Sequence, residues 1–231
     1  MCDDHSRKFL GTGFAFAASA VAFAAMIGVA SSASAALLLP GNIGPTAVTP
    51  TQLASLPAGD TPVPLGTQSN AFTGAPLGHF SGTLTSTVYS DPNTGAYDFV
   101  YVVTSDDTST DGIERLTLSS FGSALTTTDA DYYNVALTDV DPTTADRSTN
   151  GHVVGFSFST IEIGPGQTTA QLIVETSAHN FSTGSGAVID GAVGNAQVNV
   201  PAIGMLTVPE PTTLAALTLV GGLLLGRRRR Q

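Results

Sequence analysis

Three histidines and many serines are the residues in the interior of this chain that could carry out acyl transfer. Such an enzyme needs a nucleophile, a histidine base and an acid that orients the histidine, and the histidines are His79, His152 and His179. None of them lies in a recognisable local motif, and the chain has no G-x-S-x-G sequence. No two of them have the spacing of zinc ligands. We therefore predict no catalytic residue and no zinc site.

A second group of candidates could bind calcium through oxygen atoms. Asp107, Ser109 and Asp111 form, with the glycine that follows, the D-x-S-x-D-G opening of a calcium-binding loop. The twelfth position of that loop is Leu118, where a bidentate glutamate is expected, and no flanking helices are indicated. Calcium therefore stays an alternative to solvated turns in which Asp and Thr side chains cap backbone groups. No other cofactor is predicted. Two further D-x-D pairs are Asp129/Asp131 and Asp139/Asp141.

Paired carboxylates could also hydrolyse a polysaccharide, one acting as the acid and the other as base or nucleophile. The interior has enough acidic residues for some pair to lie close together. The chain has no tryptophan to form an aromatic platform for a sugar ring, and it has five tyrosines. Tyr132 or Tyr133 could stack on a sugar, although the strand pattern favours a place in the core. A carbohydrate-active hydrolase is therefore one alternative function.

The charge balance excludes one class of partner. Of the 18 acidic residues, 15 remain when Asp3, Asp4 and Glu210 near the ends are set aside, and between Leu37 and Thr207 they face only two arginines, Arg115 and Arg147. A segment with this acidic excess repels phosphate, so we predict no binding to nucleic acid. The one cysteine is Cys2, in the leader described next, so the processed chain would have no thiol.

The amino end has the order of a secretory signal peptide. Arg7 and Lys8 precede an apolar run, residues 9–30, which ends in small residues. These include the A-x-A pattern Ala33-Ser34-Ala35, which predicts cleavage after Ala35, before Ala36. The run approaches the length of about 20 residues that spans a membrane, so an uncleaved anchor is the alternative. Its Ala- and Gly-rich composition and the A-x-A end favour removal.

The carboxyl end holds three elements in order. The first element is Val208-Pro209-Glu210-Pro211, whose prolines favour an extended backbone conformation. An apolar segment of 12 residues, 214–225, follows and would be about 18 Å long as a helix, shorter than the hydrocarbon core of about 30 Å. The four arginines Arg227, Arg228, Arg229 and Arg230 then predict a cytoplasmic tail, with residues 36–211 on the outer side. An ordinary single-pass anchor is the alternative interpretation.

These three elements resemble the PEP-CTERM sorting signal of Gram-negative bacteria that make exopolysaccharide. The resemblance covers residues 208–231 and implies that an exosortase, a multi-spanning membrane transpeptidase, recognises Pro209, Glu210 and Pro211. It further implies that residues 214–225 hold the chain in the membrane and that Arg227–Arg230 act as a cytoplasmic stop signal.

Between the two signals the pattern changes at about residue 79. Residues 36–78 are rich in Pro and Thr and predict an extended, partly ordered arm in which residues 37–39 could add a short strand. Residues 79–207 predict a β-sandwich domain of short strands separated by turns such as Asp91–Gly95. The predicted strands are 79–90, 97–105, 113–120, 131–139, 153–163, 168–176, 187–190 and 197–202.

The fold class is therefore all-β, an antiparallel β-sandwich of about seven or eight strands between an N-terminal signal peptide helix and a C-terminal sorting helix. The candidate core residues are Leu84, Val88, Phe99, Tyr101, Val103, Leu116, Leu118, Val135, Leu137, Val154, Phe156, Phe158, Leu172 and Val174.

Together these patterns predict an exported, non-enzymatic protein of the cell surface or extracellular matrix with a structural or adhesive role. Its expected partners are the export machinery, signal peptidase, an exosortase-type transpeptidase and matrix exopolysaccharide. The C-terminal helix would anchor it in the inner membrane only transiently, before delivery to the surface or medium. Two alternatives stay open, the hydrolase above and an unprocessed, membrane-tethered periplasmic protein.

Overall fold

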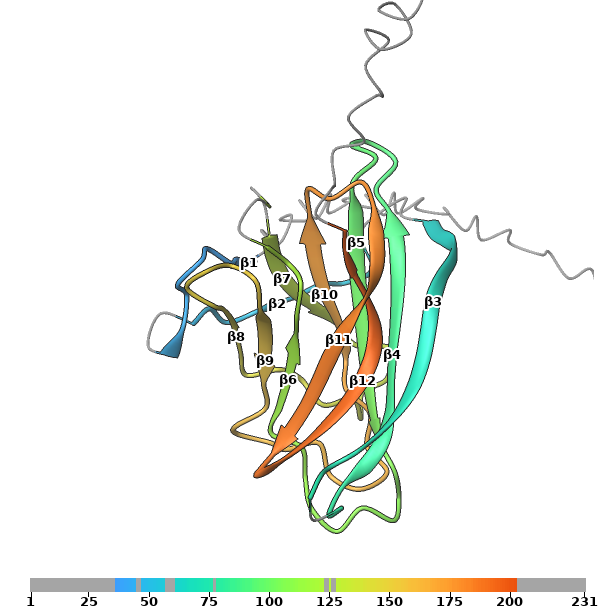
Figure 1. Cartoon of the computed structure of the whole chain (residues 1–231), viewed down its shortest axis with the longest axis vertical. Helices are drawn as coiled ribbons and strands as arrows, with labels where there is room; N and C mark the ends of the chain where they lie inside the picture. Colours follow the sequence, from blue (N-terminus) through green and yellow to red (C-terminus); the bar gives the residue numbers. More distant parts are fainter. Residues whose placement is uncertain are drawn as a thin grey trace, which may run out of the picture. The chain divides into compact units, whose positions relative to one another are not determined.

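The structure is a computed structural model that describes residues 36–44, 47–56, 61–76, 78–122, 125 and 128–202. The predicted signal peptide and sorting signal lie outside these residues, and so do both predicted terminal helices. The described part is all-β, with two mainly antiparallel sheets of seven and five strands that share one core (Figure 1). Within this part, no helix has the length and hydropathy needed to cross a membrane.

The seven-stranded sheet has the order β1-β7-β10-β5-β4-β3, with β2 also paired to β7. Its strands are β1 (Ala36–Leu37), β2 (Thr51–Gln52), β3 (Thr61–Thr73), β4 (Ser81–Ser90), β5 (Tyr97–Ser105), β7 (Thr128–Tyr133) and β10 (Gln171–Thr176). All of its pairs are antiparallel except β2 with β7.

The five-stranded sheet has the order β12-β11-β6-β9-β8. Its strands are β6 (Arg115–Leu118), β8 (Thr144–Arg147), β9 (Val154–Ser157), β11 (Phe181–Asp190) and β12 (Ala192–Pro201). Strand β12 packs against β3, β4 and β5, so the two sheets form the layers of a sandwich (Figure 1).

The central β4–β5 hairpin follows from strict alternation of side chains. Leu84 and Val88 of β4 point into the core together with Phe99, Tyr101 and Val103 of β5, and all five are fully buried. The predicted strand 97–105 is β5 itself, with the same bounds. The core side chains predicted from β6, β9 and β10 are also buried, which confirms the period-two interpretation of these strands.

Two candidate core residues were wrong. Val135 is 67% exposed and Leu137 is fully exposed. The predicted strand 131–139 ends early, because β7 stops at Tyr133 and the chain then turns. The Asp139 carboxylate accepts hydrogen bonds from the backbone amides of Val135 (2.9 Å) and Ala136 (2.8 Å), and this local pairing replaces a strand.

The prediction of an extended, partly ordered arm over residues 36–78 was wrong for its last part, whereas the short strand expected at residues 37–39 is present as β1. That last part is β3, a strand of 13 residues that pairs along β4 and forms one edge of the sheet. An edge strand tolerates proline because one side of its backbone makes no ladder hydrogen bonds, and the register shifts between Pro62 and Thr67. Phe72 of this strand is buried against Phe80, with ring centroids 6.2 Å apart. The fold therefore begins well before residue 79.

The last hairpin is longer than predicted. Strands β11 and β12 pair from Phe181 with Pro201 to Asp190 with Ala192, whereas the predicted strands covered only 187–190 and 197–202. The chain reverses at Gly191, whose φ of 59° lies in the left-handed region that glycine adopts most easily. The first half of β11 is rich in Ser, Thr and Gly, which hid it from a pattern based on apolar residues.

Candidate functional site

Acidic residues line up across the outer face of the seven-stranded sheet, the face turned away from the core. Glu175 of β10 lies directly opposite Asp98 of β5 on one side and Asp129 of β7 on the other. Side chains that are directly opposite in antiparallel strands have Cβ atoms about 4.5–5.5 Å apart, and like charges there destabilise the sheet. Asp98, Glu175 and Asp129 therefore place three carboxylates side by side on this face.

Asp131 stands two residues after Asp129 on the same face of β7. It is completely buried, and neither of its carboxylate oxygens accepts a hydrogen bond of good geometry within the described residues. Burial raises the pKa of Asp131 to about 6, and the charge of Asp129 adds to this. The backbone amides of Ala36 and Thr51 and the hydroxyl group of Thr51 lie near the carboxylate and lower its pKa. Asp131 is thus the least satisfied acid of this face.

The surroundings of Asp131 are built from the start of the described chain. Strand β1 runs antiparallel to β7, with Ala36 opposite Ala130, while β2 runs parallel to it, with Thr51 opposite Asp131. Both short strands therefore begin at the same point along β7 and lead away from it. We call this point the β1–β2 junction, made of Ala36, Thr51, Ala130 and Asp131.

The residues considered for calcium have different partners in the fold. The hydroxyl group of Ser109 donates to the carbonyl of Ser81 (3.1 Å) and accepts from the amide of Ser81 (3.1 Å), so it staples a loop to β4. Asp107 lies against Gly166 instead. Within the described residues, no three His, Cys, Asp or Glu side chains are arranged to hold a metal ion. Calcium binding by Asp107, Ser109 and Asp111 stays a prediction.

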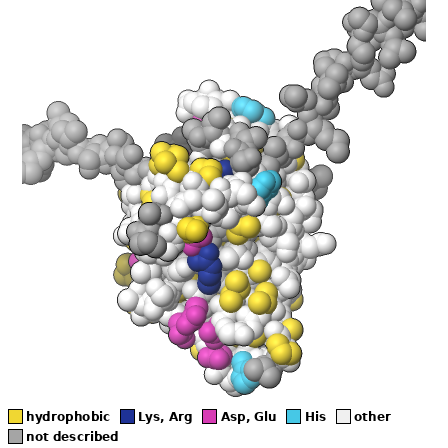
Figure 2. Space-filling view, turned by 60° about the vertical axis from the view of Figure 1, so that its left-hand side comes forward, with side chains coloured by type: hydrophobic (Ala, Val, Ile, Leu, Met, Phe, Trp, Pro, Cys, Tyr) yellow, Lys and Arg dark blue, Asp and Glu magenta, His cyan; other side chains and the backbone are white. Residues whose placement is uncertain are grey.

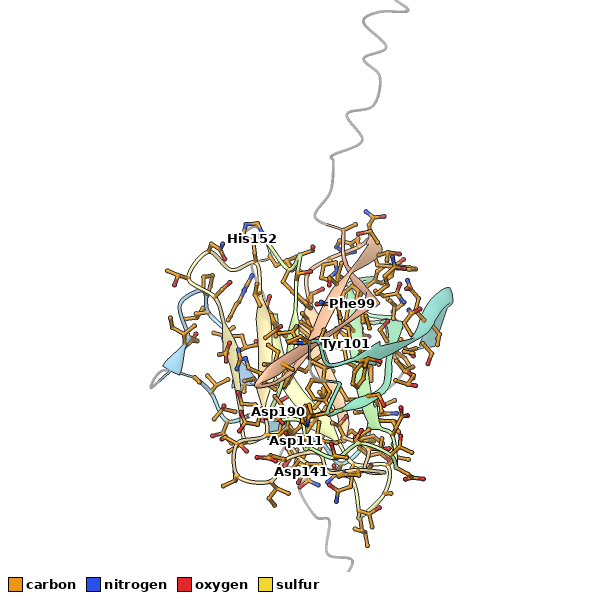
Figure 3. All side chains as sticks on the ribbon, turned by 60° about the horizontal axis from the view of Figure 1, so that its bottom comes forward. Phe99, Tyr101, Asp111, Asp141, His152 and Asp190 are labelled. Atoms are coloured by element: carbon orange, nitrogen blue, oxygen red, sulfur yellow. The ribbon has the colours of Figure 1, made fainter. Side chains whose placement is uncertain are left out.

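The third calcium candidate, Asp111, belongs to an acidic group at one end of the sandwich. Burial raises the pKa of Asp190, and the charges of Asp111, Glu114 and Glu162 raise it further. A hydrogen bond between Asp111 and Asp190 contributes in the same direction. Figure 3 shows Asp111 and Asp190 together at this end, with His152 at the opposite end. These acids therefore repel one another at Asp190.

An open pocket of about 350 Å³ lies near the predicted D-x-D pair Asp139/Asp141. It is lined by Thr138, Asp139, Val140, Asp141, Pro142, Thr143, Thr160, Ile161 and Gln167. Asp139 already accepts two backbone hydrogen bonds. Burial raises the pKa of Tyr132, and the nearby charge of Asp141 raises it further. Tyr132 packs against the core, as its strand position favoured. Neither Asp129 nor Asp131 lines this pocket.

The histidines occupy separate places. His179 Nδ1 is 2.8 Å from the carbonyl oxygen of Gly95, at the turn that joins β4 to β5. The backbone carbonyl of His79 accepts a hydrogen bond from Thr110 Oγ1 (3.2 Å). His152 follows Gly151, and its backbone amide donates to Asn150 Oδ1 (3.1 Å). Each histidine lies in a loop.

The described residues include two cations, and both have partners. Arg115 makes a two-point ion pair with Asp146, at 2.7 and 2.8 Å, on the partly exposed face of the five-stranded sheet. Arg147 is buried and donates to the carbonyl oxygens of Gly151, Leu38 and Gly122 at 3.0, 3.1 and 2.7 Å. Figure 2 shows that charged side chains cover little of the face in view and that acidic groups lie beside a basic one.

Comparison with known proteins gives no match. No protein-family model fits the chain, and no curated protein and no solved structure is significantly similar to it.

The sequence-predicted processing sites fall on both sides of the described fold. Ala33 and Ala35 precede it, while Val208, Pro209, Glu210, Pro211 and Arg227–Arg230 follow it, all outside the described residues. Ala36, the residue after the predicted cut, is the first residue of β1. The sequence did not single out the β1–β2 junction. The usable signal was the run Thr128-Asp-Ala-Asp-Tyr, which places Asp129 and Asp131 on one face when it forms a strand.

Proposed function

We propose that this protein is an exported, non-enzymatic component of the cell surface or extracellular matrix, delivered through a C-terminal signal of the PEP-CTERM type. The observation that carries the proposal is the order of parts along the chain. Every described strand lies between Ala36 and Pro201, between the predicted signal peptidase site and the Pro209-Glu210-Pro211 motif. Removal of both signals would leave the described sandwich intact.

The chemistry of the sandwich supports a structural or adhesive role in an exopolysaccharide-containing matrix. Hydroxyl side chains pair across β3 and β4, with Ser69 and Thr85 2.9 Å apart and Thr67 and Thr87 3.4 Å apart. Such a face offers hydrogen-bond donors and acceptors that can pair with the hydroxyl groups of a sugar. The excess of acidic residues disfavours a nucleic-acid partner.

The sorting step is tested by following the protein through cell fractions of the native host. In the wild type we expect the sandwich at the cell surface or in the medium, without Arg227–Arg230. In the variant Pro209→Ala/Glu210→Gln/Pro211→Ala we expect it to stay in the membrane fraction with its arginines attached. Glu162→Gln, a carboxylate change within the sandwich, is the matched control and should be sorted normally. Equal sorting of both variants would rule out recognition of the motif.

The adhesive step needs a separate test, with purified sandwich, matrix polysaccharide and whole cells. Binding to either, with or without added calcium, is the expected result. Absence of binding to both under both conditions would remove the adhesive role and leave sorting untouched.

A carbohydrate-active hydrolase is the second candidate, and the raised pKa of Asp131 is the observation that favours it. Asp129 and Asp131 are the pair that would serve as acid and base, and because Asp131 is fully buried, a sugar would reach it only after the β1–β2 junction had opened. Release of reducing sugar from matrix polysaccharide, abolished by Asp131→Asn, would support the hydrolase over the structural role.

A further inference from the structure

The β1–β2 junction holds a buried carboxylate next to the backbone nitrogen atom that the predicted cleavage would release. The amide of Ala36 faces Asp131, and Ala36 lies opposite Ala130 in the sheet. Both oxygens of Asp131 and one oxygen of Asp129 are buried without a hydrogen bond of good geometry. Only uncharged donors, the amides of Ala36 and Thr51 and the hydroxyl group of Thr51, lie near Asp131. A buried carboxylate that lacks a charged partner and well-formed hydrogen bonds destabilises a fold, and a cation placed beside it reduces that penalty.

The described part of the chain supplies no such cation. Its two arginines are Arg115, which pairs with Asp146, and Arg147, which donates to three carbonyl oxygens. The other titratable groups on this face of β7, β10 and β5 are Asp129, Glu175, Asp98 and Tyr133, and none of them is a cation. Strands β1 and β2 contribute only Ala, Leu, Thr and Gln.

Hydrolysis of the Ala35–Ala36 bond would create a cation at this place. Water adds to the carbonyl carbon of Ala35, the C–N bond breaks, and Ala35 leaves as a carboxylate. The nitrogen of Ala36 keeps the electron pair, takes up the protons and becomes an ammonium group. One amide donor without charge is thereby replaced by three N–H donors with one positive charge.

We propose that the α-ammonium group of Ala36, formed when the leader is removed, binds the carboxylate of Asp131 and holds the starts of β1 and β2 against β7. This inference rests on the cleavage site of the proposed function. It makes leader removal a step that completes the sheet, because the ion pair exists only in the cleaved chain. The precursor is then the less stable form, as suits a chain that must cross a membrane before it folds.

The composition of the chain allows a clean test. Lys8 is the only lysine and lies in the leader, so the α-amine of Ala36 is the one primary amine of residues 36–231. This segment contains all described strands and can be released from an N-terminal fusion with Ala36 as its first residue. Acetylation then blocks that amine alone and returns it to an uncharged amide like that of the precursor. The free and acetylated forms are compared by urea unfolding at pH 7.

We expect the unfolding equilibrium constant of the free form to be about tenfold lower or more, because an ion pair typically shifts a carboxyl pKa by about 1–3 units. In Asp131→Asn the difference between free and acetylated forms should vanish. In Asp107→Asn, which removes an exposed carboxylate from a turn outside the β1–β2 junction, the difference should remain. A difference that persists in Asp131→Asn, or no difference in the wild type, would overturn the proposal.

A second readout keeps the test decisive if Asp131→Asn does not fold. In the folded wild type, the pKa of the Ala36 amine should exceed the value of about 7.7–8.0 for an unperturbed chain end, and acylation of the amine should be slower than in urea. An unperturbed pKa together with unprotected acylation would contradict the ion pair. Because these are measurements on purified protein, they are independent of sorting. Whether cells cut before Ala36 is read separately from the N-terminal sequence.

Discussion

The backbone nitrogen of Ala36 faces the buried carboxylate of Asp131 at the point where β1 and β2 both begin along β7. Ala36 is also the first residue after the predicted signal peptidase site. The residue before which the chain would be cut therefore lies beside the least satisfied acid of the sheet, so cleavage there would place a positive charge next to Asp131.

The pH dependence of stability should report on Asp131 in the acetylated chain. Its pKa is raised from 3.8 to about 6 by burial, so the folded state binds a proton more tightly than the unfolded state. That contribution to stability is present below about pH 4 and is lost as the pH rises through about 6. After discounting for solvent screening, acetylated wild type should lose about 1–2 kcal/mol more than acetylated Asp131→Asn between pH 4 and pH 7. Urea unfolding at both pH values measures this, and a parallel pH dependence of the two chains would contradict it.

Asp129 and Glu175 also lie on this face and could contribute to the pH dependence of stability. The comparison with Asp131→Asn is therefore needed to assign the effect to Asp131. Burial raises the pKa of Asp129 too, in the same direction.

Arg147 should matter for stability far more than Arg115. Substitution Arg147→Met leaves the carbonyl oxygens of Leu38, Gly122 and Gly151 without their donor and should lower the free energy of unfolding by about 2–4 kcal/mol. Arg115→Met breaks a partly exposed ion pair and should lower it by about 1 kcal/mol. Chemical denaturation of the two variants compares them directly. A larger loss of unfolding free energy in Arg115→Met than in Arg147→Met would contradict a stabilising role for the buried guanidinium of Arg147.

The place of β3 in the fold is tested with Phe72. Phe72→Ala removes a buried ring that packs on Phe80 and should lower the free energy of unfolding by about 3–5 kcal/mol. Leu137→Ala is the matched control, because Leu137 was a candidate core residue and is fully exposed; it should change stability by less than about 0.5 kcal/mol. If residues 61–73 did not pack on the sandwich, Phe72→Ala would change the free energy of unfolding as little as the control does.

Gly82 should not tolerate a side chain. A Cβ atom at this position of β4 would collide with the backbone carbonyl of Thr104 and would lie 2.8 Å from Phe72 Cζ. Because the carbonyl belongs to the neighbouring strand and cannot move aside, Gly82→Ala should cost about 2–4 kcal/mol. At Gly164 the added Cβ would meet the end of the flexible Gln167 side chain at 3.0 Å, and Gly164→Ala should cost less than about 1 kcal/mol. Equal thermal unfolding of the two variants would contradict the close approach of β4 and β5.

The central strands could be predicted from the sequence because their alternation is strong and their turns are local. Strand β5 shows both, since Phe99, Tyr101 and Val103 share one face and Asp91 accepts from the Asn93 amide (2.8 Å) in the turn before it. The run that contains Val135 and Leu137 also alternates. There, however, the Asp139 carboxylate accepts hydrogen bonds from two backbone amides, and the segment forms a turn. Alternation alone does not distinguish these two cases.

Strand β3 and the β1–β2 junction could not be predicted because both depend on partners far away in the chain. Strand β3 begins with two prolines and continues with a run of polar residues, and it forms a strand through pairing with β4. Asp129 and Asp131 looked like a solvated D-x-D pair, whereas the burial of Asp131 requires the segments around Ala36 and Thr51. Contacts of this kind arise from the sheet as a whole.

The central claim, that the sandwich is processed at both ends and delivered to the surface, is tested most directly by the intact mass and both terminal sequences of the protein recovered from the native cell surface or medium. We expect an amino end at Ala36 and a carboxyl end near Pro209–Pro211. A chain recovered from purified membranes that still carries Arg227–Arg230 would contradict the claim and identify a tethered periplasmic protein.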